Sequence, residues 1–265
     1  MKFVKSEKLF KTDCGSGELT LIFLHGTAGD HSDFNYQVNE FKEKFRVIAY
    51  DLRGHGRSFA PQAGYSIRDI ASDIDEDLTQ LGLLPGTAVI IGHSLGGLVA
   101  LELASQRIKC LRGIVLIDAP ILIPQHVQAA ISPYTDAFQG VHSKEKIEEF
   151  ANAFFFAPND EPKRRQAIIN RLVNFPREIF LQIWKETGSY DAETAVRLCQ
   201  LPALFIHASV PTDIAKLLKS SKFFSAVSTQ KSSHYAQFES KEEVNAMIYS
   251  FVALKVIRFI AHINS

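Results

Sequence analysis

Short apolar runs alternate with amphipathic stretches along most of this 265-residue chain. The runs are rich in β-branched residues and end at polar or glycine-marked loops, as buried strands do. They lie at residues 19–24, 45–50, 88–91, 113–117 and 203–206. The stretches between them carry apolar residues at helical spacing, and a last helical stretch runs from residue 242 to about 261. This alternation predicts an α/β fold, with a mainly parallel central sheet and helices on both faces.

One long segment, at about residues 120–199, breaks this rhythm. It has no convincing strand, and its helical stretches are separated by prolines and rich in aromatic residues. A helical insertion between two parallel strands lies over the carboxyl edge of the sheet, where ligands bind. We therefore expect a core of residues 1–119 and 200–265 with a helical cap, or lid, at 120–199. Three successive helical positions cannot all face one core, so we expect at least one side chain of Phe154 to Phe156 to face the cleft or the cap hinge.

The composition excludes several classes of partner. Lys plus Arg and Asp plus Glu both number 29, so the formal charge is zero and favours neither nucleic acid nor a membrane surface as a partner. The widely spaced Cys14, Cys110 and Cys199 indicate reduced thiols and a cytoplasmic location. No apolar stretch reaches the ~18 residues that span a bilayer, and the N-terminus has no signal-peptide core. We expect a soluble monomer or homodimer, and we expect no cofactor.

The pentapeptide Gly92-His93-Ser94-Leu95-Gly96 directly follows one of the apolar runs and precedes a helical stretch. A chain that turns sharply from strand to helix needs small residues two positions either side of the turn, which Gly92 and Gly96 supply. On such a turn the hydroxyl of Ser94 projects, and the N–H groups of the new helix point to the same space. The pattern predicts a nucleophilic serine.

A serine hydroxyl is a weak nucleophile that needs a base, usually an imidazole held by a carboxylate. Among nine histidines, His234 lies in a loop just before the C-terminal helix, where this architecture places its base. We expect His93 to point away from Ser94 and to be a packing or solvent-side residue. No spacing of histidines and carboxylates matches a metal-ligand set such as H-E-x-x-H, so we expect no metal site.

Taken together, these features resemble the α/β-hydrolase superfamily over nearly the whole chain. The matching segments are His25-Gly26-Thr27, Asp51 to Ser58, Gly92 to Gly97, and the late His234. The resemblance implies that Ser94 is the nucleophile and His234 the base. It also implies an oxyanion hole formed by the main-chain N–H groups of Thr27 and Leu95. For Asp51, Arg53 and His55 we expect structural roles.

The acid of the expected triad departs from the family pattern. Relatives usually carry it in a Gly-x-x-Asp turn after the strand that follows the cap, but here Ala208 and Pro211 occupy those two positions. Asp213 is the nearest carboxylate, two places late, and we prefer it as the acid. Asp118 is the alternative, because some members of the superfamily carry their acid after the preceding strand. Ser233 also stands before His234 where relatives typically have glycine.

The favoured function is a serine hydrolase that cleaves a small, largely apolar carboxylic ester, thioester or lactone through an acyl-enzyme. The short aromatic cap is similar to that of carboxylesterases and acyl-homoserine-lactone lactonases. A carbon–carbon bond hydrolase or a cofactor-free haloperoxidase of the same fold is a second hypothesis. A non-catalytic protein that binds a small ligand or signals is a third, because the fold alone does not imply chemistry.

Overall fold

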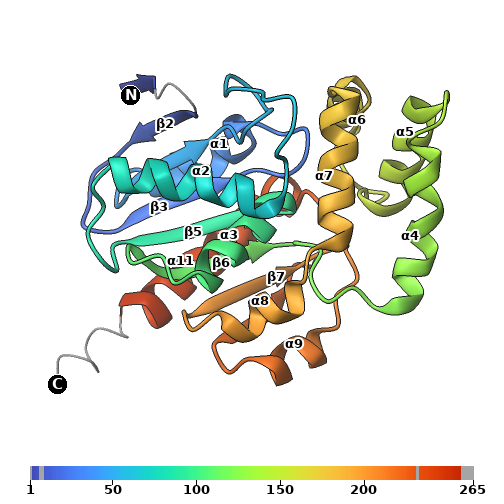
Figure 1. Ribbon diagram of the computed structural model, residues 1–265. Helices are drawn as coiled ribbons and strands as arrows, with labels where there is room; N and C mark the ends of the chain where they lie inside the picture. Colours follow the sequence, from blue (N-terminus) through green and yellow to red (C-terminus); the bar gives the residue numbers. More distant parts are fainter. Residues whose placement is uncertain (1, 6–8, 231–232, 258–265) are drawn as a thin grey trace.

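The computed structural model describes residues 2–5, 9–230 and 233–257. Eight strands form one sheet in the order β1-β2-β4-β3-β5-β6-β7-β8. Their bounds are β1 Lys2–Lys5, β2 Phe10–Cys14, β3 Thr20–Leu24, β4 Arg46–Tyr50, β5 Ala88–His93, β6 Leu111–Ile117, β7 Ala203–His207 and β8 Phe224–Ser228. β2 pairs antiparallel with both of its neighbours, β1 and β4, and all other neighbouring strands pair parallel. The predicted α/β fold with a mainly parallel sheet is confirmed (Figure 1).

Helices cover both faces of this sheet. One face carries α2 (Ile67–Gln80), α3 (Leu95–Ser105) and α8 (Ala192–Leu198), and the other carries α1 (Asn35–Phe41) and α11 (Lys241–Phe251). Strand side chains alternate between the two resulting cores: in β3, Ile22 and Leu24 pack on one face, and Leu21 and Phe23 on the other. A π-helical turn, Val252–Ile257, continues α11, and residues 258–261 of the predicted C-terminal helix lie outside the described residues.

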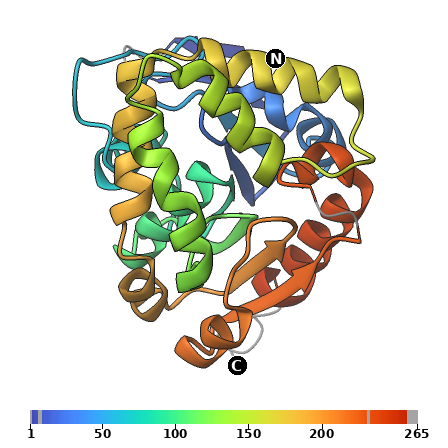
Figure 2. The same ribbon diagram turned by 90° about the vertical axis from the view of Figure 1, so that its right-hand side faces the viewer.

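Four helices between β6 and β7 form the cap: α4 (Gln125–Ala137), α5 (Ser143–Phe154), α6 (Pro162–Asn174) and α7 (Arg177–Ser189). They lie beyond the carboxyl ends of the strands, on the right in Figure 1 and toward the viewer in Figure 2. An aromatic cluster, which includes Phe138, Phe150 and Phe180, holds them together. The insertion predicted from the sequence runs to residue 199 and so includes α8, which packs against α3 on the sheet.

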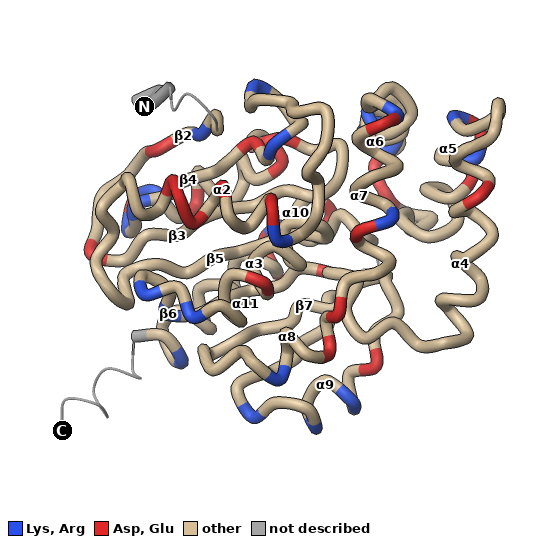
Figure 3. The backbone as a smooth tube through the Cα atoms, viewed as in Figure 1, with Lys and Arg blue, Asp and Glu red and all other residues tan. Residues whose placement is uncertain are grey.

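The remaining helices of the described residues are short: the 3₁₀ helix η1 (His31–Phe34) and the α-helices α9 (Ile214–Ser220) and α10 (Ala236–Glu239). Acidic and basic positions are interspersed along the trace seen in Figure 3. Among the described residues, no helix is both long enough and apolar enough to cross a bilayer.

Candidate active site

Ser94 stands at the junction of β5 and α3 with φ 51° and ψ −116°, a strained conformation for a residue with a side chain. The two flanking glycines make this turn possible. A Cβ on Gly92 would lie 2.1 Å from the carbonyl oxygen of Gly96, and one on Gly96 would lie 2.1 Å from that of Leu24. Any larger residue at either position would push α3 away from β3 or β5, so the local sequence fixes where Ser94 sits.

His234 and Asp118 are hydrogen-bonded partners. The Nδ1 atom of His234 lies 2.8 Å from Oδ2 of Asp118, and both side chains are buried. Asp118 follows β6 with φ 45°. Its carboxylate also accepts hydrogen bonds from the backbone N–H groups of Ala208 (2.8 Å), Ser209 (3.0 Å) and Val210 (3.1 Å). The turn after β7 thus holds the carboxylate in place beside the imidazole.

These contacts also keep Asp118 ionised. Burial by itself would raise the pKa of this carboxyl. The hydrogen bond and the charge of His234, with the N–H groups of Val210 and Ala208, outweigh that effect and hold the pKa of Asp118 below its usual value. An ionised carboxylate at Nδ1 fixes the imidazole tautomer that leaves Nε2 free to accept a proton.

The preference for Asp213 as the carboxylate beside the histidine is wrong. Asp213 is exposed at the N-terminus of α9, where its Oδ1 accepts the backbone N–H of Lys216 at 2.8 Å. The physical reason lies in the turn after β7. The backbone N–H groups of this turn bind Asp118, and Asp213 lies further along the chain, where it caps α9.

Ser94 and His234 line one cavity of about 740 Å³. Its walls come from the loops after β3, β5, β6, β7 and β8 and from the inner side of the cap. The cap contributes mainly apolar and aromatic side chains: Ile131, Ile147, Phe150, Phe154, Phe155, Leu172, Phe180, Ile183 and Trp184. A site of this size and lining suits a small, mostly apolar molecule.

Two backbone N–H groups are placed near the serine. Gly26 packs so closely that a Cβ on it would lie 3.1 Å from Cβ of Ser94, and the next residue, Thr27, lines the cavity. Leu95 is the first residue of α3. Within the described part of the chain, the N–H groups of Thr27 and Leu95 donate to no protein acceptor. The described residues therefore leave both groups unpaired.

Sequence reasoning missed two supports of His234. The ring of Phe155 stacks on the imidazole with centroids 4.4 Å apart and 18° between the planes. His93 is a packing residue, but its Nε2 also lies 2.8 Å from the carbonyl oxygen of His234. Burial lowers the pKa of His93 well below its usual value, so this ring is neutral and donates through Nε2. Neither contact has a local sequence signal, because the partners are far apart in the chain.

The three successive phenylalanines, Phe154 to Phe156, also have contacts with residues far away in the sequence. At least one of the three was predicted to face the cleft, and Phe154 and Phe155 both line the cavity. The three are not successive helical positions, since α5 ends at Phe154. Phe156 stacks on Tyr235 instead, with ring centroids 6.0 Å apart.

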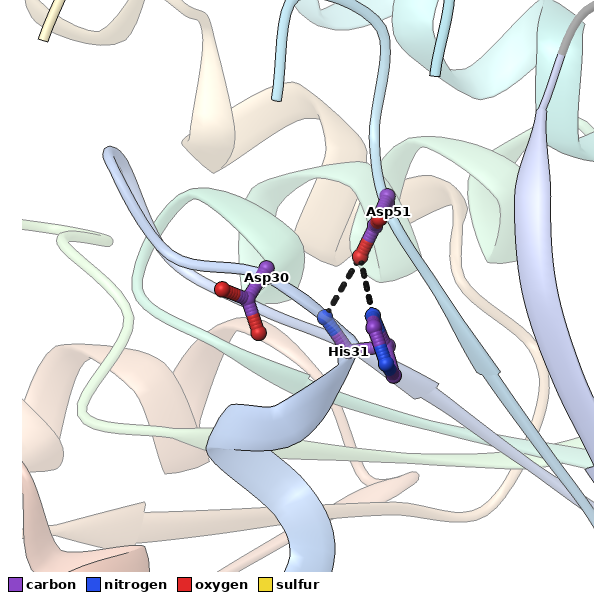
Figure 4. Close-up of side chains that lie close together, drawn as sticks. All are labelled: Asp30, His31 and Asp51. Atoms are coloured by element: carbon purple, nitrogen blue, oxygen red, sulfur yellow. Dashed lines mark hydrogen bonds and ion pairs between the residues drawn. The ribbon is translucent and has the colours of Figure 1, made fainter. Parts of the chain in front are cut away.

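A second histidine–aspartate pair lies outside the cavity (Figure 4). Oδ1 of Asp51 accepts both the backbone N–H of His31 and a hydrogen bond from its Nδ1, each at 2.7 Å, and Oδ2 accepts the N–H of Arg57 at 2.8 Å. Asp30 lies close enough to complete a group of possible metal ligands. However, Ser32 already donates two hydrogen bonds to Asp30, and both oxygens of Asp51 are occupied. These contacts indicate a structural cluster.

Comparisons with known proteins agree with this fold. Residues 21–246 match the model of the Alpha/beta hydrolase family. The AB hydrolase superfamily protein YisY of Bacillus subtilis (strain 168) is 30% identical over an alignment of 276 positions, which covers 94% of this chain and 98% of that protein.

Two solved structures show the same fold. An esterase (EaEST) from Exiguobacterium antarcticum superposes with a TM-score of 0.80 at 22% identity, covering 92% of this chain and 95% of the other. The enol-lactonase from Burkholderia xenovorans LB400 also gives a TM-score of 0.80, at 21% identity over 92% of this chain and 96% of the other. The chain belongs to the alpha/beta hydrolase family and is a hydrolase.

Proposed function

We propose that this protein is a serine hydrolase that cleaves a small, largely apolar carboxylic ester, thioester or lactone through an acyl-enzyme. The observation that carries the proposal is that Ser94 and His234 line one largely apolar cavity and that His234 is hydrogen-bonded to Asp118. The fold similarity to an esterase and an enol-lactonase supports the same class of reaction. We assign Ser94 as nucleophile, His234 as base and Asp118 as acid.

The reaction follows from these positions. Oγ of Ser94 attacks the carbonyl carbon while Nε2 of His234 takes its proton, and Asp118 stabilises the imidazolium that forms. The N–H groups of Thr27 and Leu95 bind the developing oxyanion, and loss of one such donor costs roughly 2.7–4 kcal/mol of transition-state stabilisation. His234 then returns the proton to the leaving alcohol or thiol. A water molecule, deprotonated by His234, releases the acid and restores Ser94.

The cavity limits the substrate. Its volume of about 740 Å³ exceeds what an acetyl group fills, and the cap lines it with aromatic rings. We therefore expect higher kcat/KM for esters with medium-length or aromatic acyl groups than for acetates.

A fluorophosphonate probe tests the chemistry directly. We expect the probe to label the wild type and to leave Ser94→Ala unlabelled. Asp213→Asn is the control, because Asp213 is an exposed residue at the rim of the same cavity, and we expect it to label like the wild type. Turnover should appear on para-nitrophenyl esters or lactones. Folded wild-type protein that neither labels nor turns over would instead indicate a ligand-binding protein. Activity on a dienone alone would indicate a carbon–carbon bond hydrolase, and bromination alone a haloperoxidase.

We also propose that the protein acts in the cytoplasm as a monomer or a homodimer. The three cysteines, Cys14, Cys110 and Cys199, are all free thiols, which suits a reducing compartment. Size-exclusion chromatography with light scattering measures the oligomeric state.

A further inference from the structure

The cap holds the loop that carries His234. The backbone N–H of His234 donates to the carbonyl oxygen of Phe155 at 2.9 Å, just after α5 ends. On the acid side, the hydroxyl of Ser209 contacts both Oδ2 of Asp118 (3.1 Å) and the carbonyl oxygen of Phe154 (3.3 Å). The end of α5 therefore contacts the base and a residue that holds the acid.

A buried side-chain hydrogen bond strengthens this link. Oγ of Ser233 donates to Oδ2 of Asp160 at 2.7 Å, and both residues are buried. The same carboxyl oxygen accepts the backbone N–H of Ala157 at 3.0 Å, which folds the segment between α5 and α6 around it. A short hydrogen bond from a hydroxyl to a carboxylate is stronger than one between neutral groups. A glycine at position 233, the residue typical of relatives, could not make this bond.

The same segment also sets the plane of the imidazole. The ring of Phe155 stacks on His234 at 4.4 Å, so a shift of the segment would move the ring as well as the backbone of the base. Proton transfer needs the reacting atoms within a few tenths of an ångström of their productive positions. The side-chain hydrogen bond of Ser233 therefore adds a constraint on the loop beyond the backbone bond of His234.

We propose that Ser233 and Asp160 are positioning residues through which the cap holds His234 in place for proton transfer with Ser94. The proposal rests on the function proposed above, in which His234 is the base. Neither residue touches the substrate: the cavity lining includes His234 and Phe155 but neither Ser233 nor Asp160. Their effect is expected on the rate of the chemical step and not on substrate binding.

Three variants test this. Ser233→Ala removes only the donor oxygen, Asp160→Ala removes the acceptor, and Asp160→Asn retains a carbonyl oxygen that accepts the same bonds. We expect Ser233→Ala to lower kcat and the rate of fluorophosphonate labelling by about ten-fold, the effect of one lost hydrogen bond, with KM changed by less than about two-fold. Asp160→Ala, which also leaves the N–H of Ala157 without its acceptor, should lower both rates by at least as much. Asp160→Asn should restore most of the rate. Ser105→Ala is the matched control, because Ser105 donates a similar hydrogen bond within α3, to the carbonyl oxygen of Glu102.

A readout that needs no turnover separates this proposal from the proposed function. In proton NMR, the Nδ1–H of His234 donated to Asp118 gives a low-field signal, which we expect Ser233→Ala to shift or broaden and Ser105→Ala to leave unchanged. An unchanged signal and unchanged kcat in Ser233→Ala would overturn the positioning role. So would a loss confined to KM, or an Asp160→Asn variant as slow as Asp160→Ala. Absent labelling of the wild type would overturn the proposed function alone, since the NMR comparison still reports on the loop.

Discussion

The two histidine–aspartate pairs of this protein are almost alike in geometry and differ in what surrounds them. In each, an imidazole Nδ1 lies within 2.8 Å of a buried aspartate that follows a strand of the sheet. Asp118 follows β6 and holds a histidine that lines the same cavity as Ser94. Asp51 follows β4, and its histidine packs on Phe10 with ring centroids 5.0 Å apart. A histidine–aspartate pair alone does not define a catalytic site. The site also needs a nucleophile or substrate within reach of the other ring nitrogen, Nε2.

The acceptor atoms of the two aspartates are used differently as well. The carboxylate of Asp118 accepts hydrogen bonds from backbone N–H groups of the turn after β7, so it joins the loops after β6 and β7. Asp51 binds the N–H groups of His31 and Arg57, which closes the loops after β3 and β4. We therefore expect substitutions in the first pair to affect turnover most and substitutions in the second to affect folding most.

Asp118→Asn should give the largest effect. Its φ of 45° is well tolerated by asparagine, and the amide oxygen can still accept the backbone N–H groups, so we expect the fold to persist. The amide N–H₂, however, would face Nδ1–H of His234, which disfavours the tautomer that acts as a base. We expect kcat for an ester substrate to fall by about 10³–10⁴-fold, measured by steady-state kinetics. A loss under ten-fold with an intact fold would mean that another group orients the imidazole.

Asp51→Asn should lower stability more than turnover. Both oxygens of Asp51 accept hydrogen bonds, and a Cβ on the neighbouring Gly56 would lie 2.2 Å from Oδ2, so the site has no room to rearrange. In either orientation, the amide would set one N–H group against a backbone N–H. We expect the free energy of unfolding in urea to fall by ~1–3 kcal/mol, while kcat/KM of the folded fraction stays within about three-fold. A loss of several decades in kcat would contradict the structural role of this pair.

The second pair should also be visible in the pH dependence of stability. The hydrogen bond to Asp51 raises the pKa of His31 above its usual 6.5, so the fold prefers the protonated ring. This contribution is fully present below pH 6.5 and is lost as pH rises through the raised pKa. His25, His55 and His93 have pKa values lowered by burial, and they act in the opposite direction.

The difference between wild type and His31→Gln isolates this contribution, because the buried histidines are common to both proteins. We expect the wild type to exceed His31→Gln in unfolding free energy by a few tenths to about 1 kcal/mol at pH 6, and by less at pH 8.5, in urea titrations at both pH values. A difference that grows with pH would contradict the assigned sign.

Sequence reasoning identified the elements that local patterns control. The apolar runs predicted β3 to β7, and the glycines around Ser94 predicted the turn that the structure shows. The two strands at one edge, β1 and β2, and the last strand, β8, were missed, because these short edge segments lack a long apolar run. The expected contact between Asp213 and His234 is absent for a related reason. Asp118 and Asp213 both lie after strands, and only the three-dimensional path of the turn after β7 decides which carboxylate meets His234.

Asp213→Asn should give the smallest effect, and it sharpens the choice of acid. Asp213 caps α9 through its Oδ1, and asparagine is an equally good N-cap residue, so the hydrogen bond to the N–H of Lys216 can persist. The side chain is exposed, which limits any change in stability to about 0.5 kcal/mol. We expect kcat/KM within two-fold of the wild type in the same assay that detects the loss in Asp118→Asn. A drop of decades in Asp213→Asn would require the loop after β7 to bring this carboxylate to His234 during turnover, and the near-neutral result would leave Asp118 as the acid on chemical as well as geometric grounds.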